Sequence, residues 1–190
     1  MSPVDNVLQA IQLTSDEIQY FNGLLKERHF KKKEFILRSG DLCTHETYIV
    51  NGCVRIYYND DKGVEHVVKF AIENWWALDL QSFELQVPAF YSIQALEDTT
   101  TFQINKADHD RLYESVPKFE KFARLRYQNS YILLQDRMTQ HLFSTAEERY
   151  EHFTRKYPGL ELRISQKDIA SYLGITPEFL SMLRRKRVSA

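Results

Sequence analysis

The sequence is poor in glycine and cysteine and contains no long apolar run. Its 190 residues include six glycines and two cysteines, Cys43 and Cys53, which excludes a collagen-like, linker or low-complexity chain. Two thiols supply too few ligands for a zinc or iron–sulfur site and too few pairs for a disulfide scaffold. No segment approaches the roughly 18 apolar residues of a membrane span, and residues 1–17 lack the basic flank and apolar core of a signal peptide. These absences predict a cytoplasmic protein with no metal, no cofactor and no membrane partner.

The composition that remains is that of an ordinary globular protein. Hydrophobic residues make up 43% and charged residues 27%, so enough apolar surface is present to offset the entropy of ordering the chain. The net charge of −1 is unevenly distributed, because residues 163–190 carry +4 and residues 1–162 carry −5. A basic end on an acidic chain indicates that one part contacts a polyanion. A solvated tail that aids solubility is the alternative.

Strand-like runs dominate the first half of the chain. After a helix predicted over residues 14–28, short β-branched and aromatic runs extend to Asn105. Gly40, Gly52 and Gly63 recur among them at intervals of 12 and 11 residues, a spacing typical of a compact antiparallel roll or sandwich. The expected fold class is therefore α+β, with an N-terminal antiparallel β-roll.

A long segment after Pro117 predicts a single helix. It contains no glycine and no second proline up to Ser144, and a helix of about 27 residues spans roughly 40 Å. One apolar stripe can pack on the roll, and the other requires a partner, most simply the same helix of a second copy of the chain. Burial of both stripes within one chain is the alternative. The first stripe comprises Tyr127, Tyr131, Leu134, Met138 and Leu142; the stripe assigned to the dimer helix comprises Phe122, Leu125, Asn129 and Ile132.

The C-terminal region predicts two short helices joined by a glycine turn. Ser165 with Asp168 three residues later is a capping-box start, and Gly174 supplies the left-handed geometry that ends a helix. Thr176 caps the next helix, and Pro177 occupies its first position. Such a pair followed by Arg-Arg-Lys-Arg indicates a helix-turn-helix that binds double-stranded DNA, although helix pairs also occur as plain packing units.

The second helix of this pair has two predicted faces. Phe179, Leu180 and Leu183 are expected to face inward, and Glu178, Ser181, Met182 and Arg185 outward. The basic residues after Met182 are expected to neutralise phosphates without reading the sequence. The residues assigned to DNA contact are Ser165, Gln166, Thr176, Pro177, Glu178, Ser181, Met182, Arg184, Arg185 and Lys186.

Six segments carry a resemblance to a known family: residues 36–70 (ILRSGDLCTHETYIVNGCVRIYYNDDKGVEHVVKF), ENWWALDLQSF, IQALED, VPKFEKFARLRYQNSYILLQDRM, AEERYEHFTRKYP and SQKDIASYLGITPEFLSMLRRK. In this order the chain resembles the Crp/Fnr superfamily of bacterial transcription regulators, in particular a short-tailed group common in Bacteroidetes. The resemblance implies a cyclic nucleotide-binding-type jelly roll, a dimerisation helix and a C-terminal winged helix-turn-helix. It also implies a homodimer on a palindromic site, with RNA polymerase as a further partner.

The expected domain boundaries follow from these segments. Residues 1–116 form a β-roll sensor domain, residues 117–145 a dimerisation helix and residues 146–190 a helix-turn-helix DNA-binding domain. Members of the family commonly continue beyond the recognition helix, whereas little of this chain follows Arg187.

The predicted effector pocket departs from the family pattern. Nucleotide-binding members carry a Gly-Glu pair that holds the ribose and a later Arg-Ser or Arg-Thr pair that binds the phosphate. Leu78 and Asp79 stand at the first pair, and no lysine or arginine occurs between Lys69 and Lys106. A buried phosphate without a cationic partner is costly, which argues against cyclic AMP as an effector. The candidate pocket residues are Trp75, Trp76, Leu78, Asp79, Tyr91 and Ser92, although adjacent tryptophans are also typical of a core.

Other departures bear on the ligand and on DNA specificity. The oxygen-sensing branch needs a cysteine cluster near its N-terminus, and the six histidines show no ligand spacing for haem. Met182 stands where many members carry an arginine that contacts guanine, so specificity is expected to shift toward a thymine methyl. No nucleophile elbow, phosphate loop, dinucleotide fingerprint or zinc-protease motif is present, which argues against an enzyme. The alternative to a DNA-binding regulator is a small-molecule-binding roll whose helical tail docks a protein.

Overall fold

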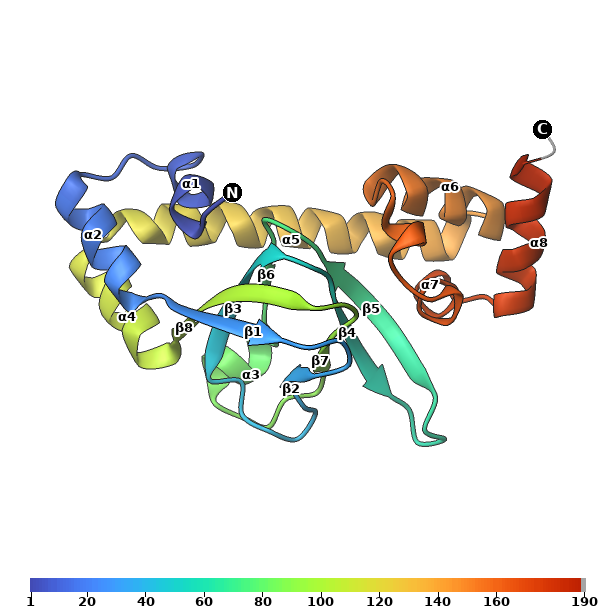
Figure 1. Ribbon diagram of the computed structural model, residues 1–190, viewed down its shortest axis with the longest axis horizontal. Helices are drawn as coiled ribbons and strands as arrows, with labels where there is room; N and C mark the ends of the chain where they lie inside the picture. The colour runs from blue at the N-terminus through green and yellow to red at the C-terminus, as the bar shows by residue number, and fades with distance from the viewer. Residues whose placement is uncertain (189–190) are drawn as a thin grey trace.

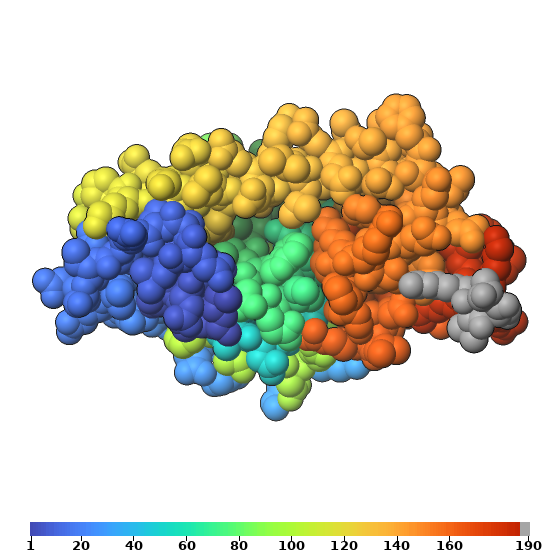
Figure 2. All heavy atoms as spheres, turned by 90° about the horizontal axis from the view of Figure 1, so that it is seen from above, coloured from blue at the N-terminus to red at the C-terminus, as the bar shows by residue number. Residues whose placement is uncertain are grey.

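The computed structural model describes residues 1–188, and the side chains of residues 1–186. A β-roll occupies the middle of the molecule, one long helix runs along its length, and shorter helices gather at both ends (Figure 1 and Figure 2). No helix within the described residues is both long enough and apolar enough to cross a bilayer.

The N-terminal helix is shorter than predicted. α2 (Ser15–Leu24) starts at a reciprocal capping box between Thr14 and Glu17, which satisfies two backbone N–H groups at the helix start. Leu25 has extended backbone, with φ −82° and ψ 134°, and the next residues pair with a strand instead of continuing the helix to residue 28. The prediction is wrong at this end because pairing in the sheet overrides a weak local helix preference.

A second helix, α1 (Pro3–Leu8), precedes it and was not predicted. Ser2 caps it and Pro3 occupies its first turn, with a reciprocal bond between Ser2 and Asp5. This is a recognisable helix-start signal. α1 and α2 pack with α4 and the start of the long helix at the same end of the molecule (Figure 1).

The roll consists of two four-stranded antiparallel sheets, which confirms the predicted fold class. Gly52 makes the turn between β3 and β4 at φ +106°, where a Cβ atom would lie 2.5 Å from the Thr99 hydroxyl oxygen, so only glycine fits. One sheet has the order β1 (Lys26–Phe30), β8 (Thr99–Asn105), β3 (His45–Asn51) and β6 (Trp76–Ala77); the other has the order β2 (Phe35–Leu37), β7 (Ser92–Ala95), β4 (Val54–Asn59) and β5 (Glu65–Ala71).

Strand alternation separates two cores in the first half of the chain. On β3, Ile49 points between the sheets, where it packs with Ile56 and Ile93, whereas Tyr48 points to the helices of the N-terminal end. A short helix, α3 (Leu80–Leu85), closes one side of the roll. The two cysteines are buried and unpaired, and burial raises the pKa of Cys43 and that of Cys53, the latter to about 12, so both thiols stay protonated at neutral pH.

The second half of the chain is helical throughout. Between residues 106 and 188 the described chain contains no strand, so the wing that the resemblance implied is absent from this part of the structure. No segment between the described helices is long enough to form the β-hairpin of a wing. They are α4 (Lys106–Ser115), α5 (Lys118–Phe143), α6 (Ala146–Lys156), a 3₁₀ turn at Leu160–Leu162, α7 (Gln166–Leu173) and α8 (Pro177–Val188).

The C-terminal helices share a core with the roll. Phe70 of β5 contacts the rings of Phe153, Tyr157 and Tyr172, with centroid separations between 5.3 and 6.1 Å. The Ser171 hydroxyl of α7 accepts a hydrogen bond from the Val67 backbone N–H at 2.9 Å. The helix pair is therefore packed against β5 and is not a separate unit on a linker (Figure 1).

A buried ion-pair network ties α7 to β4. The Arg55 guanidinium lies 2.7 Å from the Asp168 carboxylate and 2.9 Å from that of Glu65. The side chains of Arg55 and Asp168 are 10% and 9% exposed, so solvent screens their attraction little. The hydrogen bond from Arg55 also holds the pKa of Glu65 below its usual value.

Candidate DNA-binding surface and roll pocket

The helix-turn-helix has the local geometry predicted for it. The Ser165 hydroxyl accepts a hydrogen bond from the Asp168 N–H at 3.1 Å at the start of α7. Gly174 ends α7 in the left-handed region, at φ 67° and ψ 39°. The Thr176 hydroxyl accepts a hydrogen bond from the Phe179 N–H at 3.2 Å, and Pro177 is the first residue of α8. The predicted caps at Ser165, Gly174 and Thr176 are confirmed, but the capping box is only half formed, because the Asp168 carboxylate bonds to Arg55 and to the Ser165 hydroxyl and not to the Ser165 N–H.

The outward face of α8 is wider and more apolar than predicted. Glu178, Met182 and Arg185 are exposed, whereas Leu180 and Leu183 are buried in the core shared with α7. Phe179 is 39% exposed, so the prediction that it faces inward is wrong. Its position three residues before Met182 places both side chains on the same helix face, opposite the two buried leucines.

The basic residues after Met182 differ in their surroundings. Arg184 is half-buried, and its guanidinium donates to the Glu161 carbonyl at 3.4 Å, so it lies against its own chain and away from the exposed face. The Lys186 ammonium lies 3.1 Å from the Glu147 carboxylate in an exposed pair, which an incoming phosphate can displace at little cost.

The remaining predicted DNA-contact residues lie at the two helix starts and beside the outward face. Ser165 and Gln166 are exposed at the start of α7, and Thr176 and Pro177 at the start of α8. Ser181 is half-buried beside the face. The structure thus brings the predicted set together on one end of the molecule, apart from Arg184.

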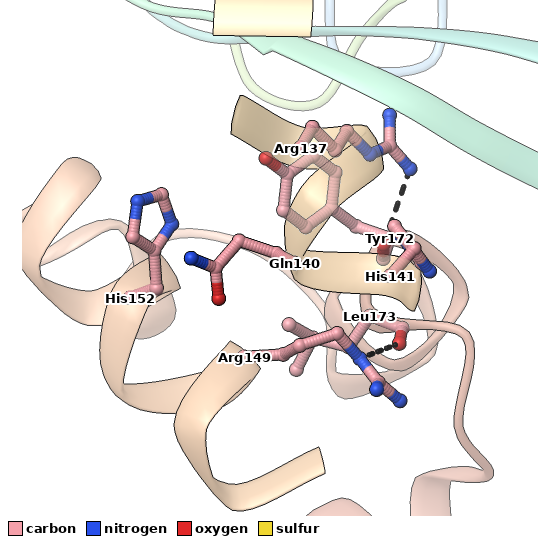
Figure 3. Close-up of a pocket in the computed structure, with 7 residues that line it drawn as sticks. All are labelled: Arg137, Gln140, His141, Arg149, His152, Tyr172 and Leu173. Carbon is pink, nitrogen blue, oxygen red and sulfur yellow. Dashed lines mark hydrogen bonds between the residues drawn. The ribbon is translucent and has the colours of Figure 1, made fainter. Parts of the chain in front are cut away.

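Two arginines that the sequence did not predict donate hydrogen bonds to the C-terminal end of α7 (Figure 3). Arg149 of α6 donates to the Leu173 carbonyl at 3.1 Å, and Arg137 of α5 donates to the Tyr172 carbonyl at 3.2 Å. Both satisfy carbonyls that the end of a helix leaves free and place positive charge at the negative end of its dipole. The cavity between them measures about 20 Å³, enough for one water molecule.

The contact between α5, α6 and α7 lowers the pKa of His141. Burial lowers its pKa, and the positive charges of Arg137 and Arg149 lower it further. The imidazole is therefore neutral at pH 7, and the junction gains no further positive charge. Arg137 also donates to the Val67 carbonyl of β5 at 3.0 Å, so one side chain links the long helix, the roll and α7.

The exposed stripe of α5 differs from the one assigned to the dimer helix. Tyr131, Leu134, Met138 and Leu142 follow each other at helical spacing, and Leu134 and Met138 are 63% and 59% exposed. Ile132 lies beside this stripe and is also exposed. Four successive large apolar side chains on one face form an unpartnered surface along the second half of α5.

Phe122, one of the residues predicted to form the dimer contact, is buried within its own chain. It is 5% exposed and packs on Trp76 and Phe119, with ring centroids 6.2 and 6.3 Å away. The first half of α5 is covered by the N-terminal helices, so Phe122 offers no surface to a second copy. Leu125 is half-buried, and Asn129 is exposed.

Asp79, one of the predicted effector-pocket residues, is hydrogen-bonded to the backbone of its own chain. Its side chain is buried at the start of α3, where one carboxylate oxygen accepts from the Ser82 N–H at 3.1 Å. The other accepts from the N–H groups of Phe90 and Tyr91 at 2.9 and 3.0 Å. Backbone donors that could bind an anion are therefore satisfied by the chain itself.

The other pocket candidates have packing and capping roles. Trp75, Leu78 and Tyr91 pack against the core of the roll. The Trp76 ring packs on Tyr48 in a tilted arrangement, with ring centroids 5.0 Å apart. The Ser92 hydroxyl accepts a hydrogen bond from the Ser39 N–H at 3.0 Å.

Replacing Asp79 tests whether its carboxylate holds this segment together. We expect Asp79→Ala to lower the free energy of unfolding by about 2 kcal/mol, because a helix cap is lost and two part-buried N–H groups lose their acceptor. Urea denaturation measures this difference. Glu84→Ala, on the exposed side of α3, is the control and is expected to change stability by less than about 0.5 kcal/mol. Equal effects of the two changes would contradict the role given to Asp79.

The fold and its site define a class of protein: a cyclic nucleotide-binding-type roll joined by a long helix to a helix-turn-helix. Residues 27–116 match the family model of the cyclic nucleotide-binding domain. The chain therefore carries a cyclic nucleotide-binding domain, and its structural neighbours are transcription regulators of the Crp/Fnr family. The comparison with curated proteins finds no match to the sequence.

Three solved structures illustrate this likeness. FixK2 from Bradyrhizobium japonicum is 19% identical, with a TM-score of 0.77 over 87% of this chain and 85% of that one. The c-di-GMP-responsive global regulator CLP from Xanthomonas campestris is 13% identical, with a TM-score of 0.75 over 93% and 92%. A regulator described as Crp/Fnr family from Eubacterium rectale is 18% identical, with a TM-score of 0.75 over 99% and 88%.

Proposed function

We propose that the protein is a transcription regulator of Crp/Fnr type that binds a palindromic DNA site as a homodimer. The observation that carries this proposal is the outward face of α8, which presents polar, apolar and basic side chains together at one end of the molecule. Glu178 can accept from a cytosine amino group, and Met182 and Phe179 can contact a thymine methyl. Arg185 and Lys186 lie at the edge of this face, where the backbone phosphates of bound DNA would lie.

The exposed stripe of α5 supports the homodimer. Leu134, Met138 and Leu142 would be buried against the same residues of a second copy, since a twofold axis brings one surface onto itself. Two α8 helices related in this way would enter successive major grooves, about 34 Å apart. We therefore place the dimer contact in the second half of α5. Of the residues that the sequence assigned to this contact, Ile132 is part of it and Phe122 is not.

The proposed role of the roll is to bias the position of α8. A signal in residues 1–116 would act through the helix at residues 117–145 on residues 146–190, and Arg137 is the side chain that contacts all three parts. A ligand can shift this arrangement only if it binds the two positions with different affinity. Because the Asp79 carboxylate already accepts from the N–H groups of Phe90 and Tyr91 and no lysine or arginine occurs between Lys69 and Lys106, we do not expect cyclic AMP to be that ligand. Constitutive DNA binding set by the protein level is equally allowed.

A selection from random duplex DNA tests the proposal. The purified protein is mixed with the pool at low and at physiological salt, and the bound molecules are sequenced. An enriched palindrome supports a dimeric, sequence-specific DNA-binding regulator. Failure to enrich any sequence at either salt would contradict the proposal and favour a helical tail that docks a protein through Phe179 and Met182.

Removing basic residues from the edge of α8 has a defined effect on salt dependence. We expect Arg185→Ala and Lys186→Ala each to weaken DNA binding and to lower the slope of log affinity against log salt by about 2 per dimer, because each phosphate contact contributes about 0.9. Binding isotherms at four salt concentrations measure the slope. Arg111→Ala on α4, at the opposite end of the molecule (Figure 1), removes the same charge and should leave the slope unchanged. An unchanged slope in the α8 variants would remove them from the interface.

A further inference from the structure

The start of the helix-turn-helix is bound to the roll through Arg163. This residue lies between the 3₁₀ turn and α7, and its guanidinium donates to both carboxylate oxygens of Glu73, at 2.6 and 3.1 Å, and to the carboxylate of Glu97. Glu73 precedes β6 and Glu97 precedes β8, so both acceptors belong to turns of the roll. The hydrogen bonds to Glu73 and Glu97 raise the pKa of Arg163 above its usual value, so the two carboxylates stabilise its charge.

Lys167 makes a second contact of this kind. Its ammonium lies 3.1 Å from the carboxylate of Glu65 on β5. Residues 157–183 contain two basic side chains, Arg163 and Lys167. Carboxylates of the roll therefore neutralise both cations at the first helix of the helix-turn-helix.

These two cations flank the place where the DNA backbone is expected to lie. Ser165 and Gln166, which were assigned to DNA contact, are exposed between them at the start of α7. The first helix of a helix-turn-helix crosses the DNA backbone, and arginine and lysine are its usual partners for phosphate. A guanidinium binds a phosphate with the same paired N–H groups that bind a carboxylate. Glu73 therefore occupies the N–H groups of Arg163 that a phosphate would need.

We propose that Arg163 and Lys167 form a second phosphate-binding site, and that carboxylates of the roll compete with DNA for it. This inference rests on the proposed DNA-binding role of α8. The side chains of Arg163 and Glu73 are 33% and 30% exposed, and that of Lys167 is 74% exposed, so water reaches these pairs and a phosphate can displace a carboxylate at low cost. The roll thus weakens DNA binding and reduces its salt dependence, because part of the positive charge is already neutralised within the chain.

Neutral variants of the two acidic residues beside Arg163 test the competition in the full chain. We expect Glu73→Gln combined with Glu97→Gln to bind the palindrome selected from random duplex DNA about tenfold more tightly at low salt, because Arg163 of each chain gains a charged contact. The slope of log affinity against log salt should steepen by about 2 per dimer, since each phosphate contact contributes about 0.9. Glutamine at residue 73 can still accept from the Gly52 N–H, as the carboxylate does at 3.0 Å.

Two further variants identify the cause of the gain. Adding Arg163→Gln to the double variant should return the slope to that of the unaltered protein, because the released cation is then absent. Asp110→Asn combined with Glu114→Gln removes the same charge from exposed positions of α4, at the opposite end of the molecule (Figure 1), and should leave the slope unchanged. We expect α7 to stay on the roll in every variant, because the Ser171 hydroxyl still bonds to the backbone of β5, and circular dichroism checks the fold.

Three results would overturn the inference while the unaltered protein still binds DNA, and so would leave the proposed function intact. They are an unchanged slope in the double variant, an equal gain in the α4 variant, and a gain that persists after Arg163→Gln. Absence of DNA binding in both the unaltered protein and the double variant would overturn both proposals. Binding of the DNA pool by the double variant alone would support the competition, because only the roll carboxylates differ between the two proteins.

Discussion

Met138→Glu is expected to convert the proposed dimer into a monomer and to lower the affinity for a palindromic DNA site by at least about a hundredfold. Met138 is at the middle of the exposed stripe of α5, between Leu134 and Leu142. In a symmetric dimer the substitution places two carboxylates in one apolar interface, where each loses its hydration without gaining a partner. The monomer then contacts only one half-site, and the second α8 no longer binds as part of the same molecule.

Sedimentation equilibrium gives the oligomeric state, and binding to full and half sites gives the affinity. Leu162→Glu is the matched control, because Leu162 is 88% exposed on the 3₁₀ turn, outside the stripe, and gains the same charge. We expect this control to remain dimeric and to bind DNA as the unaltered protein does. A dimeric Met138→Glu variant with full affinity would show that the chains associate through another surface.

Arg55→Met is expected to lower the free energy of unfolding by about 3 kcal/mol. The substitution leaves the Asp168 carboxylate buried without its cation, and breaking a buried ion pair in this way costs about 3 to 5 kcal/mol. Glu65 keeps an exposed pair with Lys167 at 3.1 Å, so the loss is concentrated at Asp168. Arg55 also lies 4.1 Å from the Tyr57 ring centroid, and methionine retains part of that packing.

Urea denaturation of the variant measures the loss, and two companions identify its cause. Lys167→Met removes the exposed partner of the same network and should cost less than about 1 kcal/mol. Asp168→Asn added to Arg55→Met removes the unpaired charge and should recover at least about 1 kcal/mol. If the double variant recovers nothing, the loss comes from packing around Arg55 and not from the stranded carboxylate.

The parts that sequence reasoning predicts well are those with local signals. Ser165, Gly174 and Pro177 each define a helix end through their own backbone or side-chain chemistry, so α7 begins and ends, and α8 begins, where expected. The length of α5 follows from the absence of glycine and proline after Pro117. These features depend on residues within one helical turn of each other, so no tertiary information is needed.

The parts that escape prediction depend on contacts between distant segments. Phe122 and Met138 both lie on apolar stripes of one helix, and only the packing of the N-terminal helices shows which is covered. Phe179 looks like a core residue from its type alone. Arg137 and Arg149 carry no motif, because an arginine that caps a distant helix end leaves no spacing signal in its own segment.

The core that α7 shares with β5 also sets an order of events during synthesis. Arg55 and Asp168 are 113 residues apart in the chain, and contacts between such distant residues form slowly. The strands of the roll leave the ribosome well before α7, and α7 cannot bury Tyr172 until Phe70 is in place. We expect α7 and α8 to reach their packed position only after the roll has folded, so an incomplete chain would not present the proposed DNA-binding face.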